Sequence, residues 1–310
     1  MMSRRSAQSG AALITAILIT TIAAIAAVAM ASRQHLDIRR TTNIIESSQA
    51  YLFALGAEEW GRQLLIRDGK DNKVDHLEED WATTLPPIDV EGGRIAGQIE
   101  DLQGRFNLNN LVKNKQPSQL DVGRFRRLLR QLALDEELAQ TVTDWIDENE
   151  DVSIPGGAED FEYLGRDLPY RTPNAMMAST SELLLIKGID REVYNALLPH
   201  VTVLPEYTAI NVNTASAEVL MTLIEDMTQS EADQLIEERG DNGYESVDAF
   251  ANNTAIAGRL TDQSGLSVQT KYFIINAASE FGRGRTNLYS LVVRDDNAKV
   301  EVAMRAQGVY

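Results

Sequence analysis

The chain has 310 residues, enough for two or three domains with a substantial core, and its 44% hydrophobic and 24% charged residues are typical of a folded protein. A formal net charge of −17 argues against nucleic acid or an anionic membrane surface as the main partner, whereas an excess of carboxylates suits a hard cation such as calcium. Because cysteine is absent, disulfides and thiolate chemistry are excluded.

The N-terminal segment has the features of a membrane anchor. Residues 1–10 are polar and include Arg4 and Arg5, and residues 11–31 carry no charge. As a helix, these 21 residues would measure about 31 Å, the thickness of the hydrocarbon core of a bilayer. The two arginines favour a cytoplasmic N-terminus. We therefore expect a single-pass protein whose remaining residues face the periplasm or the cell exterior.

Two processing routes fit this start. Cleavage after the A-x-A sequence at residues 29–31 would release a soluble protein that begins at Ser32. Cleavage after Gly10 would keep the apolar helix and make Ala11 the new N-terminus. The second route is favoured because the apolar run is longer than a secretion signal needs. Helical periodicity also continues beyond it, in one stripe formed by Phe53, Ala57, Trp60 and Leu64.

Predicted strands occupy both ends of the remaining chain. A charged turn at 67–73 would end the helix, and a strand at 94–99 would continue through 104–109. Three later strands are predicted at 271–277, 286–293 and 300–304, with hairpin turns at 282–285 and 295–297. A two-stranded ribbon is marginal alone. We therefore expect an α+β fold in which the long N-terminal helix packs on one antiparallel sheet of early and late strands.

Residues 116–265 between these strands have mostly helical periodicity. One helix is predicted from Arg127 and a second over 138–146, and helices at 181–186 and 214–220 would begin behind capping Ser or Thr residues. Residues 180–201 and 211–250 form two related units, each a helix, a tight turn and a second helix. This region is therefore an inserted all-α domain of the SAM or helix-hairpin-helix type.

The second unit resembles the helix-hairpin-helix units of DNA-uptake proteins, which also open with Ile-Asn-Val-Asn-Thr-Ala, here residues 210–215. A membrane-tethered DNA-binding receptor is therefore the alternative function. Two observations weaken it. The hairpin at 225–228 lacks the glycines that let backbone N–H groups approach phosphates. Residues 211–250 contain ten acidic residues and one basic residue, so phosphate neutralisation is poorly supported.

The densest polar stretch, residues 144–163, is a candidate calcium site. Alternating oxygen-bearing side chains in a loop can surround a cation that takes 6–8 oxygen ligands. The candidate ligands are Asp147, Asn149, Asp151, Glu159, Asp160 and Glu162. It is not an EF-hand, because Val152 stands in the place of the turn glycine and Ala158 in that of the final glutamate. A solvated acidic loop is the alternative.

We predict no enzymatic activity. The sequence has three histidines, no G-x-S-x-G and no H-E-x-x-H motif. A glycosidase-like carboxylate pair in the acidic loop would lack an aromatic sugar platform beyond Trp145.

Several motifs carry a family resemblance. Residues 9–31 resemble a type IV prepilin leader and helix, cut after Gly10. Five further motifs occur in the order found in the K-type minor pseudopilins of type II secretion systems. They are FNLNNLV (106–112), TDWIDENED (143–151), GAEDFEY (157–163), SELLLIKGI (181–189) and INVNTA (210–215). The fifth residue after the cut is Thr15, where most pilins and pseudopilins have a glutamate that pairs with the N-terminal ammonium of a neighbour.

The resemblance implies a division of the chain and a set of partners. The parts would be a leader at 1–10, a transmembrane segment at 11–31, pilin-like residues 32–112 and 267–310, and the inserted domain at 113–266. Processing by prepilin peptidase would be followed by methylation of the new N-terminus. The partners would be the I- and J-type minor pseudopilins, the major pseudopilin, the inner membrane, and at the tip the secreted cargo or the outer-membrane channel. The resemblance further implies bound calcium and no nucleic acid.

Overall fold

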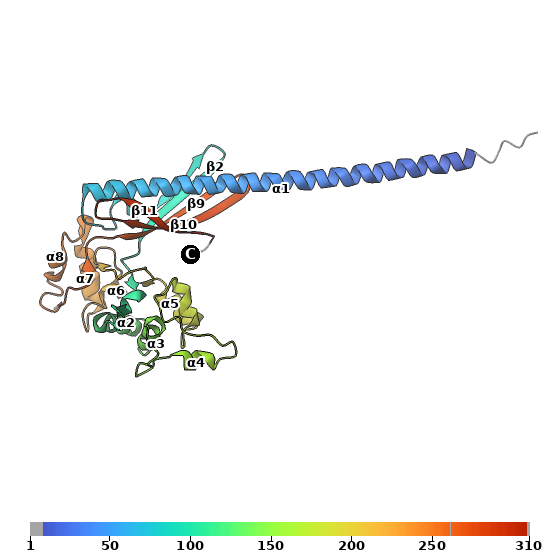
Figure 1. Cartoon of the computed structure of the whole chain (residues 1–310). Helices are drawn as coiled ribbons and strands as arrows, with labels where there is room; N and C mark the ends of the chain where they lie inside the picture. Colours follow the sequence, from blue (N-terminus) through green and yellow to red (C-terminus); the bar gives the residue numbers. More distant parts are fainter. Residues whose placement is uncertain (1–8, 261, 309–310) are drawn as a thin grey trace, which may run out of the picture.

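The computed structural model describes residues 9–260 and 262–308. Its dominant element is helix α1 (Ser9–Asp71), 63 residues and about 94 Å long, which extends far beyond the rest of the molecule (Figure 1). The predicted turn at 67–73 is wrong, because the helix continues to Asp71. The charged residues there are held by the sheet: Asp68 accepts a hydrogen bond from Arg294 of a C-terminal strand at 2.7 Å.

A five-stranded antiparallel sheet lies against the C-terminal half of α1 (Figure 1). The strand order is β1-β2-β9-β10-β11. The strands are β1 (Leu85–Val90), β2 (Gly93–Asp101), β9 (Tyr272–Phe281), β10 (Gly284–Arg294) and β11 (Val300–Gln307). Early and late strands are joined by the pairing of β2 with β9, in which Gly93 opposes Phe281 and Asp101 opposes Phe273. The predicted α+β sheet is therefore confirmed.

The face of α1 that packs on the sheet is a stripe of four small residues followed by one leucine. It consists of Ala50, Ala54, Ala57, Gly61 and Leu65, all buried. At Gly61 an added Cβ would meet the side chains of Ile275 and Ile99 at 3.3 Å. Of the predicted stripe only Ala57 is buried, and Trp60 is 45% exposed. The predicted continuation of the helix beyond the apolar run is confirmed, because α1 extends to Asp71. The helix face on the sheet is rich in small residues because helix and sheet approach closely.

One buried carboxylate ties α1 to the sheet. Glu58 accepts hydrogen bonds from Arg305 Nε and Nη2 on β11, both at 2.7 Å, and a further bond from Ser290 on β10. Burial opposes the charged form, but the hydrogen bonds from Arg305 and Ser290 outweigh burial and hold the pKa of Glu58 below its ordinary value. The pair therefore fixes the register of helix on sheet.

The chain between β2 and β9 is mostly helical. Its α-helices are α2 (Gln119–Gln131), α3 (Leu138–Ile146), α4 (Asp160–Leu164), α5 (Arg191–Leu197), α6 (Ala217–Leu220), α7 (Gln229–Glu238) and α8 (Val247–Ala251). Short 3₁₀ helices occur in this part at Leu108–Leu111, Thr180–Leu185 and Gly240–Asn242, and a further one, Asp80–Ala82, precedes β1. Three two-stranded pairs complete it: β3 (Phe106–Asn107) with β6 (Val201–Thr202), β4 (Val112–Lys113) with β5 (Gln116–Pro117), and β7 (Ile210–Asn211) with β8 (Leu266–Ser267).

Local side-chain bonds decide where these helices begin. The helix predicted from Arg127 starts earlier, because the Ser118 hydroxyl caps α2 by accepting from the Asp121 N–H. The segment predicted as a helix at 181–186 is a 3₁₀ helix with a capping box of Ser179 and Glu182. The helix predicted over 214–220 starts at Ala217, behind Ser216.

The strand predicted to run on through 104–109 is also wrong. After β2 ends at Asp101, the only strand there is the two-residue β3, which leads into a 3₁₀ helix. The cause is the polar sequence: the Asn107 side chain accepts from the Asn109 N–H, and a side chain that satisfies nearby backbone replaces a strand ladder.

The helical part has its own hydrophobic core. One cluster joins Phe106, Phe125, Trp145, Leu197 and Phe250 with the apolar residues around them, and the clusters under the sheet are separate from it. Figure 1 places this part at the end of α1 opposite the apolar segment. The boundaries at 112/113 and 266/267 stay a prediction.

Candidate functional site

The N-terminal part of α1 is fully exposed in the isolated chain. A window within Gly10–Asp71 has a mean hydropathy of 2.5 and no buried residue, so this helix is long and apolar enough to cross a membrane. Gly10 and Ala11, the predicted cleavage junction, lie within the continuous helix. Thr15 donates its hydroxyl to the carbonyl oxygens of Ala11 and Ala12 at 3.1 and 3.0 Å. Its polar group is therefore satisfied within its own helix, without a partner.

The acidic loop contains three buried carboxylates: Asp144 at the end of α3, Asp147 directly after it, and Glu159 before α4. The Oδ1 atom of Asp144 and the Oε1 atom of Glu159 are buried without a hydrogen-bond partner among the described residues. Gly157 passes so close that an added Cβ would lie 2.2 Å from Asp144 Oδ2. The loop is thus folded tightly around buried carboxyl groups, two of which have an oxygen without a hydrogen-bond partner among the described residues.

Burial and mutual repulsion both oppose ionisation here. Desolvation, followed by the charges of Asp144 and Asp147, raises the pKa of Glu159 to about 8. Desolvation and the charge of Asp144 raise the pKa of Asp147 to about 6. Unpaired buried carboxylates are costly, and a hard cation would remove that cost. The three carboxylates lie close enough to repel one another, so calcium stays a prediction at this loop, and Asp144 is a candidate ligand that the sequence reasoning missed.

The other predicted ligands have different surroundings. Asp160 Oδ2 accepts from Arg171 Nη1 at 2.6 Å, and Glu162 is paired with Lys187 at 3.1 Å. Asn149 and Asp151 are exposed, and the Asp151 N–H donates to Asn149 Oδ1 at 2.7 Å. The structure therefore brings Asp147 and Glu159 toward one site and leaves the other four at its edge or in other pairs.

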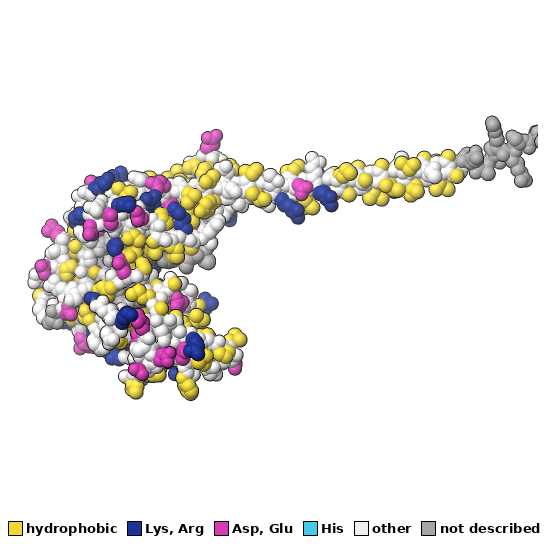
Figure 2. All heavy atoms as spheres, viewed as in Figure 1, with side chains coloured by type: hydrophobic (Ala, Val, Ile, Leu, Met, Phe, Trp, Pro, Cys, Tyr) yellow, Lys and Arg dark blue, Asp and Glu magenta, His cyan; other side chains and the backbone are white. Residues whose placement is uncertain are grey.

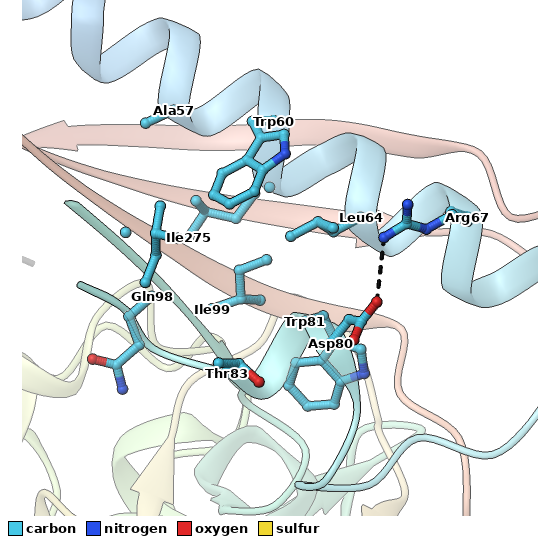
Figure 3. Close-up of a pocket in the computed structure, with 13 residues that line it drawn as sticks. Ala57, Trp60, Leu64, Arg67, Asp80, Trp81, Thr83, Gln98, Ile99 and Ile275 are labelled. Carbon is cyan, nitrogen blue, oxygen red and sulfur yellow. Dashed lines mark hydrogen bonds and ion pairs between the residues drawn. The ribbon is translucent and has the colours of Figure 1, made fainter. Parts of the chain in front are cut away.

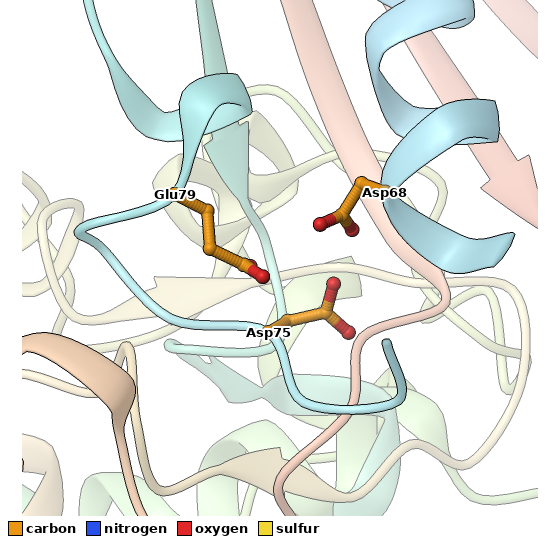
Figure 4. A group of neighbouring side chains, drawn as sticks. All are labelled: Asp68, Asp75 and Glu79. Atoms are coloured by element: carbon orange, nitrogen blue, oxygen red, sulfur yellow. The ribbon is translucent and has the colours of Figure 1, made fainter. Parts of the chain in front are cut away.

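A second acidic group lies at the end of α1. Asp68, Asp75 and Glu79 have carboxylate oxygens within 4.8 Å of one another (Figure 4). Burial, together with the charges of Glu79 and Asp75, raises the pKa of Asp68 to about 7. In this group the compensating positive charge comes from Arg294, which donates to both Asp68 and Asp75. Glu79 accepts from Trp81 Nε1 at 2.6 Å. This group is an internal ionic junction.

The two asparagine-containing motifs, at 106–112 and 210–215, have structural roles. Asn211 Nδ2 donates to the Asp75 carbonyl at 3.1 Å and to Asp101 Oδ2 at 3.0 Å. Asp101 also accepts from the hydroxyls of Thr214 and Thr270. The motif at 210–215 therefore joins the helical part to the sheet. In the other motif, Asn107, Asn109 and Asn110 bond to the backbone of residues 177 and 204–208.

The hairpin at 225–228, which would contact DNA in a DNA-binding receptor, is contacted by other residues of this chain. Glu225 is paired with Arg127 and Arg130 of α2, at 3.1 and 2.8 Å. Arg259 donates to the carbonyls of Glu225 and Asp226, both at 3.2 Å. In a DNA-binding unit this hairpin would face phosphate. Here the three arginines contact the hairpin itself, and each of them has an acidic partner within the protein.

A groove of about 290 Å³ lies between α1 and the β1–β2 side of the sheet (Figure 3). Its lining is largely apolar, and Trp60, Leu64, Trp81 and Ile99 point into it, with the Arg67–Asp80 ion pair at one end. Nothing in this lining suggests a catalytic arrangement among the described residues.

A long apolar helix laid on an antiparallel sheet, with a helical insertion between its strands, defines a pilin-like subunit with an added domain. Family models described as type II secretion system (T2SS), protein K, match residues 104–206 and 210–269. The chain is 36% identical to the type II secretion system protein K of Pseudomonas aeruginosa, over 98% of this chain and 94% of that one. It is 31% identical to the Aeromonas hydrophila protein, over 97% of each.

The chain therefore belongs to the type II secretion system protein K family, and it is a minor pseudopilin of type II secretion. A solved structure, the GspK-GspI-GspJ complex of the enterotoxigenic Escherichia coli type 2 secretion system, matches it with a TM-score of 0.78 and 28% identity. The match covers 87% of this chain and all of that one. The predicted family, fold and pseudopilin role are confirmed, and nothing supports the DNA-binding alternative.

Proposed function

We propose that this subunit occupies the tip of the pseudopilus, in a complex with the I- and J-type minor pseudopilins and above the major pseudopilin. The observation that carries the proposal is Thr15, whose hydroxyl is satisfied within its own helix. A buried acidic residue at this depth would need a cationic partner from the next subunit. A subunit without that acid needs no neighbour ahead of it. The relative of known structure was solved with GspI and GspJ, which supports the same partners here.

The shape of the chain supports an end position as well. The helical part widens the molecule only at the end of α1 farthest from the apolar segment (Figure 1). Repeated stacking of such a broad head within a thin filament would be hindered, whereas one copy at the end meets no obstacle. At the tip this head could start assembly and reach the cargo or the outer-membrane channel.

Before assembly, the apolar segment of α1 anchors the subunit in the inner membrane. Its N-terminus is cytoplasmic, where prepilin peptidase cuts between Gly10 and Ala11, and residues 32–310 are periplasmic. The basis is the uncharged run behind two arginines. N-terminal sequencing of the membrane-extracted protein tests this: Ala11 is expected, and a start at Ser32 would contradict it.

Calcium would fix the acidic loop between α3 and α4. Asp144, Asp147 and Glu159 are its first candidate ligands, with the exposed Asn149 and Asp151 at the edge of the site. Asp160 and Glu162 would have to exchange their pairs with Arg171 and Lys187 for the ion. The support is the pair of buried, unpartnered carboxylate oxygens. When bound, the ion would neutralise the repulsion between these groups. The role is structural, and we propose that the subunit has no enzymatic activity.

Co-expression with the I- and J-type subunits tests the tip assignment. We expect a ternary complex that the Thr15→Val variant still forms, since valine also needs no partner. Failure of the native chain to form any complex, or a requirement for the Thr15 hydroxyl, would refute the proposal.

A further inference from the structure

The most exposed large apolar side chains of the described residues, outside the apolar helix, gather around the acidic loop and α4. Phe161 is 93% exposed, Ile154 91% and Leu168 82%, and Val152 and Leu164 are also exposed. We call these five residues the α4 patch. Figure 2 shows apolar side chains protruding along the lower edge of the helical part, where Figure 1 places α4. Large apolar side chains this exposed usually mark an interaction surface.

The α4 patch stands on the loop that the three buried carboxylates hold. Ile154 lies between Asp147 and Glu159 in the sequence, and Phe161 follows Glu159 by two residues in the first turn of α4. Gly157 is packed against Asp144, so the two ends of the loop are drawn to the same point. The placement of the apolar side chains therefore depends on how the carboxylate charges are compensated.

Acidic residues surround the patch. Residues 147–171 contain eight acidic and two basic residues. Two of the acids are buried and three are paired with Lys or Arg, so the exposed acids without an ion pair among the described residues are Glu150, Asp151 and Asp167. Of the two basic residues, Arg171 is paired with Asp160, and the Arg166 guanidinium stacks over the rings of Tyr163 and Tyr170. A second copy of this chain, with a net charge of −17, or an anionic membrane would be repelled.

We propose that the α4 patch is a docking surface for a protein outside the filament, one that presents an apolar pocket rimmed by lysine or arginine. Charge complementarity selects this partner, since the acidic surroundings steer a basic surface while the protruding Phe161 and Ile154 enter its apolar centre. The patch belongs to the helical part and not to α1, along which the other pseudopilin helices would pack. The position of these side chains depends on the loop that calcium would fix, and in that respect the inference rests on the proposed function.

The test is a secretion assay in bacteria that lack the native gene and express the full chain. The F161S/I154S/L168S variant should reduce release of cargo into the medium by roughly tenfold or more, the effect of losing interface anchors. Ile236→Ser, which changes an exposed apolar residue of α7, is the matched control. The variant must still co-purify with the I- and J-type subunits. Loss of that complex would assign the patch to the filament and overturn the inference, as would unchanged secretion.

A second measurement tests the chemistry of the partner. With p-benzoylphenylalanine in place of Phe161, irradiation in the assembled system should give an adduct whose partner segment, sequenced by mass spectrometry, has Lys or Arg beside apolar residues. An adduct to a second copy of this chain or to an acidic segment would refute the proposal. Binding of the purified chain to phosphatidylethanolamine–phosphatidylglycerol vesicles, lost in the triple variant, would refute it in favour of a membrane. If calcium did not change the stability of the chain while the secretion and crosslinking results were as expected, only the proposed calcium site would be refuted. The docking surface would stand.

Discussion

Glu159→Gln should stabilise the chain in chelator and should reduce the stabilisation that calcium provides. The native carboxyl has its pKa raised to about 8 by burial and by Asp144 and Asp147, so at pH 7 the fold must keep it protonated. Relative to the ordinary value of 4.5, this costs up to roughly 3 kcal/mol at pH 7. Glutamine resembles the protonated form and removes the cost. In chelator, the variant should therefore be more stable than the native chain, by at most that amount.

With calcium, most of the variant's advantage should disappear, because the native chain gains more stability from the ion than the variant does. A ligand at 100 times its Kd stabilises a fold by about 2.7 kcal/mol, which corresponds to about 5 to 11 °C in Tm for a domain of 150–250 residues. If the loss of Glu159 weakens binding about 100-fold, only about 0.4 kcal/mol of that stabilisation remains. The neighbouring Glu150→Gln is the control, because Glu150 is exposed.

Residues 32–310 suffice for this assay, since residues 10–45 bury no side chain in the isolated chain. The readout is Tm by calorimetry at pH 7, with calcium and with chelator. An E159Q variant that is less stable in chelator and keeps the full calcium shift would refute both the repulsion and the metal assignment.

Further predictions concern pH, the helix–sheet contact and the tip. In chelator, native stability should fall as pH rises through about 6 and about 8, because the folded pKa values of Asp147 and Glu159 lie above their ordinary values, and calcium should remove this slope in urea unfolding curves. Gly61→Leu should destabilise the chain by about 1 to 3 kcal/mol through overpacking against Ile275, whereas Gly56→Ala, with open space around its Cβ, should add up to about 1 kcal/mol. Glu58→Ala should cost about 2 to 3 kcal/mol at neutral pH and progressively less as pH falls, since the pKa of Glu58 is lowered in the fold. Thr15→Glu should reduce recovery of the ternary complex where Thr15→Val does not, because an unpaired carboxylate is costly in the membrane; equal recovery of both would contradict the tip argument.

Much of the fold was predictable because its signals are local. The apolar run of α1, the alternation in β2 and the three late strands, and the hairpin turns each lie within a short window of sequence. Element boundaries were less predictable. The end of α1 depends on Arg294, which is distant in sequence, and the start of α2 depends on one serine hydroxyl.

The candidate metal site was predictable only in outline. The spacing of acidic residues located the loop in the sequence. It did not show which of these side chains are buried and which have a basic partner. Asp144 looked like a helix residue in the sequence, and it is buried with an unpartnered oxygen. Asp160 and Glu162 looked equivalent to Glu159, yet each has a basic partner in Arg171 or Lys187.

The sequence by itself determined the long apolar helix, the order of elements and the acidic loop, because each depends on residues adjacent in the chain. Tertiary structure alone decided which face of α1 packs, and it selected small residues there because helix and sheet lie close together. It also decided which carboxylates are paired. Asp68 and Asp75 share Arg294, while Asp144 and Glu159 keep unpartnered oxygens, because only folding brings residues distant in sequence into contact.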